Sequence, residues 1–280
     1  MSVRLLAVDL DGTLVRGDRT VSDRTRAALT GCDDAGIRVV VVTARRWLAA
    51  APVLRNLGLQ GMAIVAGGGA VRDIASGRVT MSGVLRGDAL AGAVDAILAS
   101  GLQPMVAVDH GEHYLAGHPR HDSSATARQF ARGRVTRTTV DAMRRAVAAR
   151  VLAMGPASRI AAAARRCVGL PCHLIIQDCI HRVGGGGERV LELHAAAENK
   201  GTSLRRLCRQ LRVPMGAVAA VGDAPSDLPM LEAVGTAVLM GQAEAGLRRR
   251  GMAIAPAVDA DGAAWAIERL VLCAAAPQAA

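Results

Sequence analysis

Aromatic side chains are almost absent from this sequence of 280 residues, which contains two Trp, one Tyr and one Phe. Aliphatic residues must therefore fill the core, and the apolar fraction of 51% allows this in a chain of such length. The same scarcity removes the aromatic platforms on which proteins stack single-stranded nucleic acid. We expect one large or two modest globular domains, with cores built mainly from Ala, Val and Leu.

Long apolar runs and paired cysteines are also missing. Charged or polar residues interrupt every apolar stretch before it reaches the length of a membrane span, so no membrane association is expected. The six cysteines form no C-x-x-C pair and no regular metal-finger spacing, which disfavours disulfides and a zinc site. The N-terminus shows no basic region followed by a long apolar segment, and we therefore expect a cytoplasmic protein.

The formal net charge of +10 favours anionic ligands, whether these are phosphate esters or nucleic acid. The Arg residues are scattered along the chain, except for the triplet at 248–250. With neither a basic stripe nor aromatic platforms, nucleic acid is the less favoured partner. Salt-sensitive retention on DNA, without enzymatic activity, would reverse that preference. The sequence carries no indication of an oligomeric state.

Strand and helix patterns alternate near both ends of the chain. Apolar, β-branched runs at 3–8, 37–42 and 62–66 predict strands that are buried on both faces. Ser22 is suited to cap a helix that runs to about residue 35, between the first two of these strands. This spacing predicts a parallel, doubly wound sheet, and a further strand at 217–221 extends it.

The middle of the chain has a different pattern, in which short strands and short helices are mixed. Residues 117–138 are polar and basic, and we expect them to form a loop. We therefore predict an α/β protein with a Rossmann-like doubly wound parallel-sheet core at 1–82 and 188–280. A separate α+β domain at 83–187 would be inserted into that core.

The stretch Asp9-Leu10-Asp11-Gly12-Thr13 follows the first predicted strand. Two acids at the carboxyl end of a strand stand where α/β folds bind their ligands. Their mutual repulsion is relieved by a bound cation or a shared proton. Gly12 permits a sharp exit from the strand. Taken alone, the stretch is better explained as a polar turn, so the other strand ends must decide.

Those strand ends carry further short motifs, and their order and spacing resemble the haloacid dehalogenase superfamily of phosphohydrolases. The closest resemblance is to its Cof-like branch, which carries an α+β cap inserted after the third strand. It extends over nearly the whole chain. The motifs in chain order are Asp9-Leu10-Asp11-Gly12-Thr13, Thr43-Ala44-Arg45, Gly68-Gly69-Ala70, Asn199-Lys200-Gly201, and Gly222-Asp223 with Ser226-Asp227-Leu228-Pro229-Met230-Leu231.

The resemblance implies a Mg²⁺-dependent phosphatase that hydrolyses the phosphomonoester of a small phosphorylated metabolite, such as a sugar phosphate or a phosphorylated cofactor. Asp9 would be the nucleophile and form an aspartyl-phosphate. Asp11 would be the general acid for the leaving group and then the base for water. Lys200 and Thr43 would bind the phosphoryl group.

The resemblance also implies a metal site and its surroundings. Mg²⁺ would be held by the Asp9 carboxylate, the Asp11 backbone carbonyl and Asp223. Asp227 would hold metal-bound water or orient Lys200. The remaining residues that the resemblance assigns are Ser226 in support, and Gly12, Ala44 and Arg45 for substrate binding. Candidates for recognising the leaving group in the cap are His113, Tyr114, Arg120, His121 and Arg182.

Three positions depart from the family pattern, and alternatives remain open. Ala44 replaces a Gly, Gly68 replaces an Asn and Ser226 replaces an Asn, which affects the expected substrate preference and rate more than the reaction type. One alternative is a sugar phosphomutase of the same superfamily. Another is a catalytically weak binding or regulatory protein, because each site residue taken singly has an ordinary structural explanation.

Overall fold

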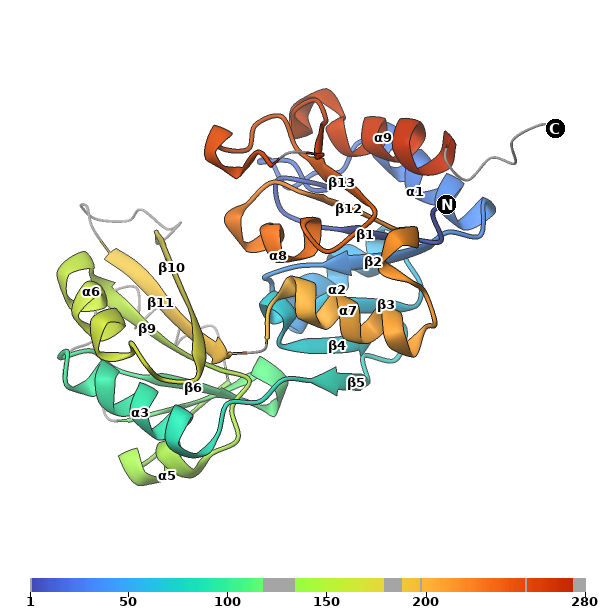
Figure 1. The fold of residues 1–280 in the computed structure, drawn as a ribbon. Helices are drawn as coiled ribbons and strands as arrows, with labels where there is room; N and C mark the ends of the chain where they lie inside the picture. Colours follow the sequence, from blue (N-terminus) through green and yellow to red (C-terminus); the bar gives the residue numbers. More distant parts are fainter. Residues whose placement is uncertain (1, 118–133, 179–187, 197, 250, 274–280) are drawn as a thin grey trace. The chain divides into compact units, whose positions relative to one another are not determined.

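The computed structural model describes residues 2–117, 134–178, 188–196, 198–249 and 251–273. It forms two compact units (Figure 1). The first unit joins the two ends of the chain, Met1–Met81 and Asn199–Ala280, and is coloured blue to cyan and orange to red. The second unit is Ser82–Glu198, coloured green to yellow.

The first unit is built on an eight-stranded sheet in the order β14-β13-β12-β1-β2-β3-β4-β5. The strands from β14 to β3 run parallel, and β4 runs antiparallel to β3. The central strand β1 lies between β2 and β12, so it joins the N-terminal and C-terminal parts of this unit. Leu5 is opposite Arg38 on one side and Val218 on the other. The strands are β1 Leu5–Val8, β2 Arg38–Val42, β3 Met62–Val65, β4 Ala70–Asp73, β5 Val79–Ser82, β12 Val218–Gly222, β13 Thr236–Leu239 and β14 Ala253–Ile254.

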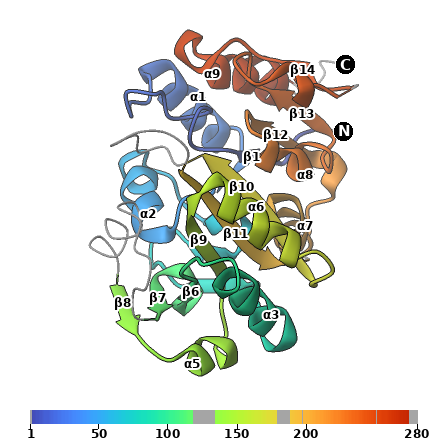
Figure 2. The same cartoon turned by 90° about the vertical axis from the view of Figure 1, so that its left-hand side faces the viewer.

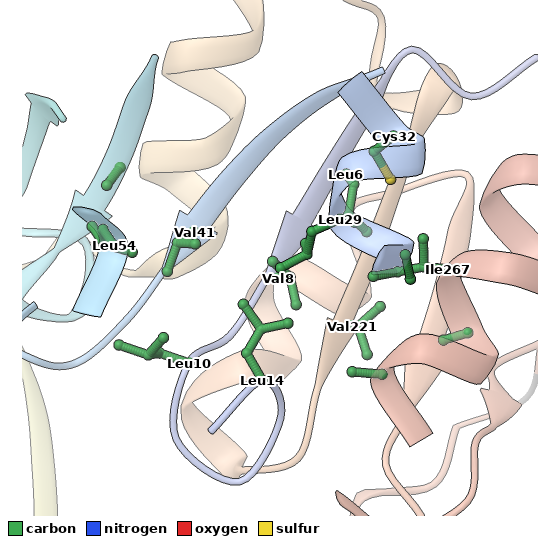
Figure 3. Close-up of a cluster of buried hydrophobic side chains, with 14 of the residues drawn as sticks. Leu6, Val8, Leu10, Leu14, Leu29, Cys32, Val41, Leu54, Val221 and Ile267 are labelled. Atoms are coloured by element: carbon green, nitrogen blue, oxygen red, sulfur yellow. The ribbon is translucent and has the colours of Figure 1, made fainter. Parts of the chain in front are cut away.

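Side chains of β1 alternate between two apolar cores, one on each face of the sheet. Leu6 and Val8 belong to a core that includes Leu29 and Ile267 (Figure 3). Leu5 and Ala7 belong to the opposite core, which is closed by α7 and α8. Helices thus cover both faces, as a doubly wound sheet requires. The helices are α1 Asp23–Asp34, α2 Trp47–Asn56, α7 Lys200–Gln210, α8 Leu228–Leu231 and α9 Gly262–Ala266.

Two helix N-termini of this unit are capped by side chains. Ser22 accepts a hydrogen bond from the Thr25 backbone N–H and caps α1, as the sequence predicted. Asn199 and Thr202 form a reciprocal capping box at the start of α7. This box fixes the direction in which Lys200 enters the helix.

The second unit contains a six-stranded sheet in the order β10-β11-β9-β6-β7-β8. Its neighbours pair antiparallel except for β7 and β8, which are parallel. Helices α3, α5 and α6 contribute to one apolar core with this sheet (Figure 2). The elements are β6 Met105–Val108, β7 His113–Ala116, β8 Arg134–Arg137, β9 Arg150–Pro156, β10 Cys172–Asp178, β11 Glu188–Ala195, α3 Gly87–Leu98, α5 Val140–Arg145 and α6 Ala157–Arg166.

The architecture confirms the predicted α/β class, with a doubly wound sheet and an α+β insertion, but two details differ from the prediction. The strand β11 pairs with β9 and β10, so the first unit resumes at Asn199 and not at residue 188. Residues 134–137, predicted as loop, form β8 beside β7. No helix in the described part of the chain combines the length and apolar character of a membrane crossing.

Candidate active site

Three of the predicted site residues directly follow neighbouring strands. Asp9 follows β1, Thr43 follows β2 and Asp223 follows β12. Because these strands are parallel neighbours, their carboxyl ends meet at one edge of the sheet. Lys200, the first residue of α7, brings its ammonium to the same edge.

Lys200 forms a buried double ion pair. Its Nζ donates to Asp9 Oδ1 at 2.6 Å and to Asp227 Oδ1 at 2.5 Å. The three residues are 2%, 5% and 0% exposed in the order Lys200, Asp9 and Asp227. Burial by itself lowers the pKa of Lys200, yet the two carboxylates outweigh that effect and hold the pKa above its ordinary value. The two carboxylates therefore favour the charged ammonium in this site.

Burial raises the pKa of Asp9 to about 7, against the opposing influence of the Lys200 charge. The neighbouring carboxylates Asp227 and Asp223 add to the increase. A further positive charge at this place would favour the ionised form of Asp9.

Asp227 has both carboxylate oxygens engaged. Oδ1 accepts from Lys200, and Oδ2 accepts from the backbone N–H groups of Asp223 at 3.0 Å and Ala224 at 2.9 Å. A Cβ on Gly222 would lie 2.6 Å from the Asp227 Cβ, so glycine is needed for this close approach. Asp227 is thus fixed in place beside the Lys200 ammonium.

Asp223 offers an oxygen that is available for a ligand. Its Oδ1 is buried and accepts no well-formed hydrogen bond from the described residues, although the Thr13 hydroxyl lies near this carboxylate and lowers its pKa. Burial raises the pKa of Asp223 to about 6, and the charge of Asp227 raises it further. Carboxylate oxygens of Asp9, Asp223 and Asp227 all lie within 4.8 Å of one another. An oxygen-rich, crowded anionic cluster of this kind fits a divalent cation.

The turn after β1 packs directly against Asp223. Gly12 has a φ of +78°, and a Cβ placed on it would lie 2.2 Å from Asp223 Oδ2. Any side chain at this position would therefore displace the carboxylate and strain the backbone. The turn is closed by the backbone N–H groups of Leu14 and Val15, which both donate to the Leu10 carbonyl.

Asp11 lies apart from the buried cluster. Its carboxylate is 54% exposed and accepts two hydrogen bonds from Arg45, with Nε at 2.8 Å from Oδ2 and Nη2 at 2.5 Å from Oδ1. This ion pair raises the pKa of Arg45. A separation of two residues on an extended strand would place Asp9 and Asp11 on the same side. However, β1 ends at Val8 and the chain turns between the two acids.

The family departures lie in well-defined surroundings. Thr43 is buried, and its Oγ1 accepts from the Arg45 backbone N–H at 3.0 Å, whereas Ala44 between them is exposed. Ser226 is half-buried in the turn before α8. Gly68 has a φ of +107°, and a Cβ there would lie 2.5 Å from the Asn199 backbone. The absence of a side chain at Gly68 therefore matches the local packing.

One residue of this site was not predicted from the sequence. Gln242 donates to the Gly12 carbonyl oxygen at 2.6 Å and lies 3.4 Å from Asp223 Oδ2. Gln242 lies in the loop after β13 and is part of no motif. The signal that could have indicated it is its position after a strand of the same parallel sheet.

The cap candidates remain predictions. Tyr114 is 1% exposed and belongs to a small apolar cluster with Met105 and Leu152 in the second unit. His113 Nε2 lies 2.8 Å from Thr136 Oγ1. The other three candidates, Arg120, His121 and Arg182, lie outside the described residues.

Comparison with known proteins identifies the family. The family described as haloacid dehalogenase-like hydrolase matches residues 6–267. This chain belongs to the haloacid dehalogenase-like hydrolases. The resemblance seen in the sequence is thereby confirmed, and so is the enzyme class, because the relatives are named phosphatases.

Three relatives indicate the range of similarity. The phosphatase YwpJ of Bacillus subtilis is 37% identical over 84 residues, which cover only 30% of each chain. The 5-amino-6-(5-phospho-D-ribitylamino)uracil phosphatase YwtE of the same organism is 22% identical and covers 96% of this chain and 98% of its own. A solved sugar phosphatase of subclass IIB has a TM-score of 0.77 at 15% identity, covering 96% of this chain and 100% of that chain. At this identity, the structural likeness supports the fold alone.

Proposed function

We propose that this haloacid dehalogenase-like hydrolase is a Mg²⁺-dependent phosphomonoesterase that forms an aspartyl-phosphate on Asp9. The observation that carries the proposal is the buried arrangement of Asp9, Lys200 and Asp227 beside Asp223. A carboxylate held by a cation, at the end of a central strand, is suited to attack a phosphoryl group.

The chemistry of the donors fits Mg²⁺. Asp9 and the buried Oδ1 of Asp223 would hold the ion, with the Asp11 carbonyl completing the protein ligands. Both oxygens of Asp227 are already engaged, so Asp227 acts by orienting Lys200. When bound, the cation neutralises the repulsion between the phosphate dianion and the carboxylates.

The reaction proceeds in two displacements at phosphorus, with Asp9 as the nucleophile in the first and the leaving group in the second. In the first, a carboxylate oxygen of Asp9 bonds to phosphorus while the bond to the leaving oxygen breaks. Asp11 donates a proton to that oxygen, and Lys200 and Thr43 stabilise the charge on the phosphoryl oxygens. In the second, Asp11 takes a proton from water, which attacks phosphorus and releases phosphate with the restored Asp9 carboxylate.

Arg45, Ala44 and Gly12 are the residues that we propose for substrate binding. Arg45 holds the Asp11 carboxylate, which is 54% exposed, in an ion pair. An arriving phosphate ester can compete for the same guanidinium, which would connect substrate binding to the release of Asp11. Ser226 lies in the turn that carries Asp227.

The substrate class we propose is a small phosphorylated metabolite, a sugar phosphate or a phosphorylated cofactor. Similar proteins are named for such compounds, among them a phosphoribityl compound and pyridoxal phosphate. The net charge of +10 also favours anionic substrates. Cytoplasmic residence remains a prediction.

A phosphate-release screen tests this function. The purified protein is incubated with a panel of sugar phosphates, nucleotides and phosphorylated cofactors, with Mg²⁺ or with EDTA. We expect Mg²⁺-dependent release of phosphate from at least one small ester. Isomerised sugar phosphate without free phosphate would instead identify a phosphomutase. No conversion of any compound would favour the binding or regulatory alternative.

A further inference from the structure

One side chain connects three segments of the first unit at the edge of the acidic cluster. Gln242 Nε2 donates to the Gly12 carbonyl oxygen at 2.6 Å and lies 3.4 Å from Asp223 Oδ2. Its Oε1 accepts from the Val258 backbone N–H at 3.0 Å. Gln242 therefore joins the turn after β1, the end of β12 and the loop before α9.

These three partners require an amide. The Val258 N–H needs an acceptor, whereas the Gly12 carbonyl and the Asp223 carboxylate each need a donor. A carboxylate at position 242 would provide no donor, and an ammonium would provide no acceptor. The same partners define which end of the amide carries the nitrogen.

The backbone that carries Gln242 is held in place although its side chain is exposed. The Gly241 N–H donates to the Pro256 carbonyl at 3.2 Å, and the Ala243 N–H donates to the Met240 carbonyl at 3.0 Å. A Cβ on Gly241 would lie 2.7 Å from the Ala255 carbonyl oxygen, which shows how closely the two loops approach. The amide thus extends from a fixed position.

The two oxygens of Asp223 have different surroundings. Oδ2 faces Gln242, whereas Oδ1 is buried and accepts no well-formed hydrogen bond in the described part of the chain. We propose that Gln242 is a positioning residue, which fixes the rotation of the Asp223 carboxylate and its contact with Gly12 so that Oδ1 faces the divalent cation. This inference rests on the proposed function, because it assumes that the acidic cluster binds Mg²⁺.

The test is the Mg²⁺ affinity of Gln242→Met, which keeps the length of the side chain and removes both hydrogen-bonding groups. Calorimetric titration of Mg²⁺ into the purified protein gives the affinity without using activity. We expect the Kd to rise about tenfold, the effect of losing one hydrogen bond to a charged group. At saturating Mg²⁺, kcat should recover toward that of the wild type.

Gln60→Met is the matched control, since Gln60 is an exposed glutamine of the same unit, located between α2 and β3. Its Mg²⁺ affinity should equal that of the wild type. An unchanged Mg²⁺ affinity in Gln242→Met contradicts the proposal. If that variant also melts at a lower temperature in EDTA, the role of Gln242 is purely structural. A wild-type protein that binds no Mg²⁺ overturns this proposal and the metal-dependent function together. Weakened binding in the variant, with no phosphate release by the wild type, supports the positioning role and overturns the phosphatase alone.

Discussion

The ammonium of Lys200 lies 2.6 Å from Asp9 Oδ1, in an ion pair whose side chains are only 2% and 7% exposed. Lys200 is also the only lysine in the sequence, where every other member of the 34 Lys and Arg residues is Arg. An ammonium is compact and directs three donors, whereas a guanidinium is a planar fork. The space between the carboxylates of Asp9 and Asp227 therefore fits the compact ammonium of a lysine better than a guanidinium. This explains a lysine at position 200 in a chain that otherwise uses arginine.

The first prediction is that Lys200→Arg removes phosphatase activity and destabilises the first unit. The larger guanidinium must displace Asp9 or Asp227, and a broken buried ion pair costs about 3–5 kcal/mol. Urea denaturation and phosphate release measure the two effects. Arg38→Lys, at an exposed position on β2, is the control and should change neither. Normal activity in Lys200→Arg would show that only the charge matters.

The second prediction concerns the contact between Gly12 and Asp223. Gly12→Ala should reduce activity and Mg²⁺ affinity, because the new Cβ would lie 2.2 Å from Asp223 Oδ2 at a φ of +78°. Gly17→Ala is a matched control a few residues later, since a Cβ there meets nothing within 4 Å. Equal Mg²⁺ titrations for both variants would argue against the close packing of this turn on Asp223.

The third prediction is a pH dependence in the second unit. Burial opposes ionisation of Glu192, but Arg150, 2.8 Å away, and His194 lower the pKa of Glu192 from 4.5 to about 2. As the pH falls, the Glu192 carboxylate takes up a proton in the unfolded chain before it does so in the folded protein. The stabilisation is therefore complete above about pH 4.5 and is lost as the pH falls toward 2.

Glu192→Gln should therefore lower the free energy of unfolding by about 3 kcal/mol near neutral pH. The difference from the wild type should shrink as the pH falls below about 4.5. Urea denaturation at several pH values measures it. A constant difference across this range would mean that packing, and not the charge of Glu192, is responsible.

Much of the first unit could be predicted because its signals are local. The β1 strand is a short apolar run, and Ser22 is followed at once by the helix that it caps. The partners of a strand are not local. The eight residues of β11 suit either sheet, and only pairing with β9 and β10 assigns them to the second unit. In the same way, β8 becomes a strand through its long-range pairing with β7.

The site shows the same limit. Asp9, Lys200 and Asp223 could be predicted because each belongs to a recognisable motif at a strand or helix end. Gln242 belongs to none of the five motifs. Its place in the site depends on contacts across the fold, and one of them, to Gly12, joins residues more than 200 positions apart. The Asp11–Arg45 ion pair forms because the chain turns after β1, between Asp9 and Asp11. The sequence pattern did not predict how that turn directs the Asp11 side chain.

The central claim is that Asp9 attacks phosphorus, and Asp9→Asn tests it most directly. The variant keeps the size of the side chain and removes the nucleophilic charge. With circular dichroism showing a folded protein and with Mg²⁺ present, we predict that hydrolysis of p-nitrophenyl phosphate falls to the level of the buffer, whereas the wild type releases p-nitrophenol and stops on addition of EDTA. Substantial hydrolysis by folded Asp9→Asn would contradict the nucleophile assignment and the mechanism built on it.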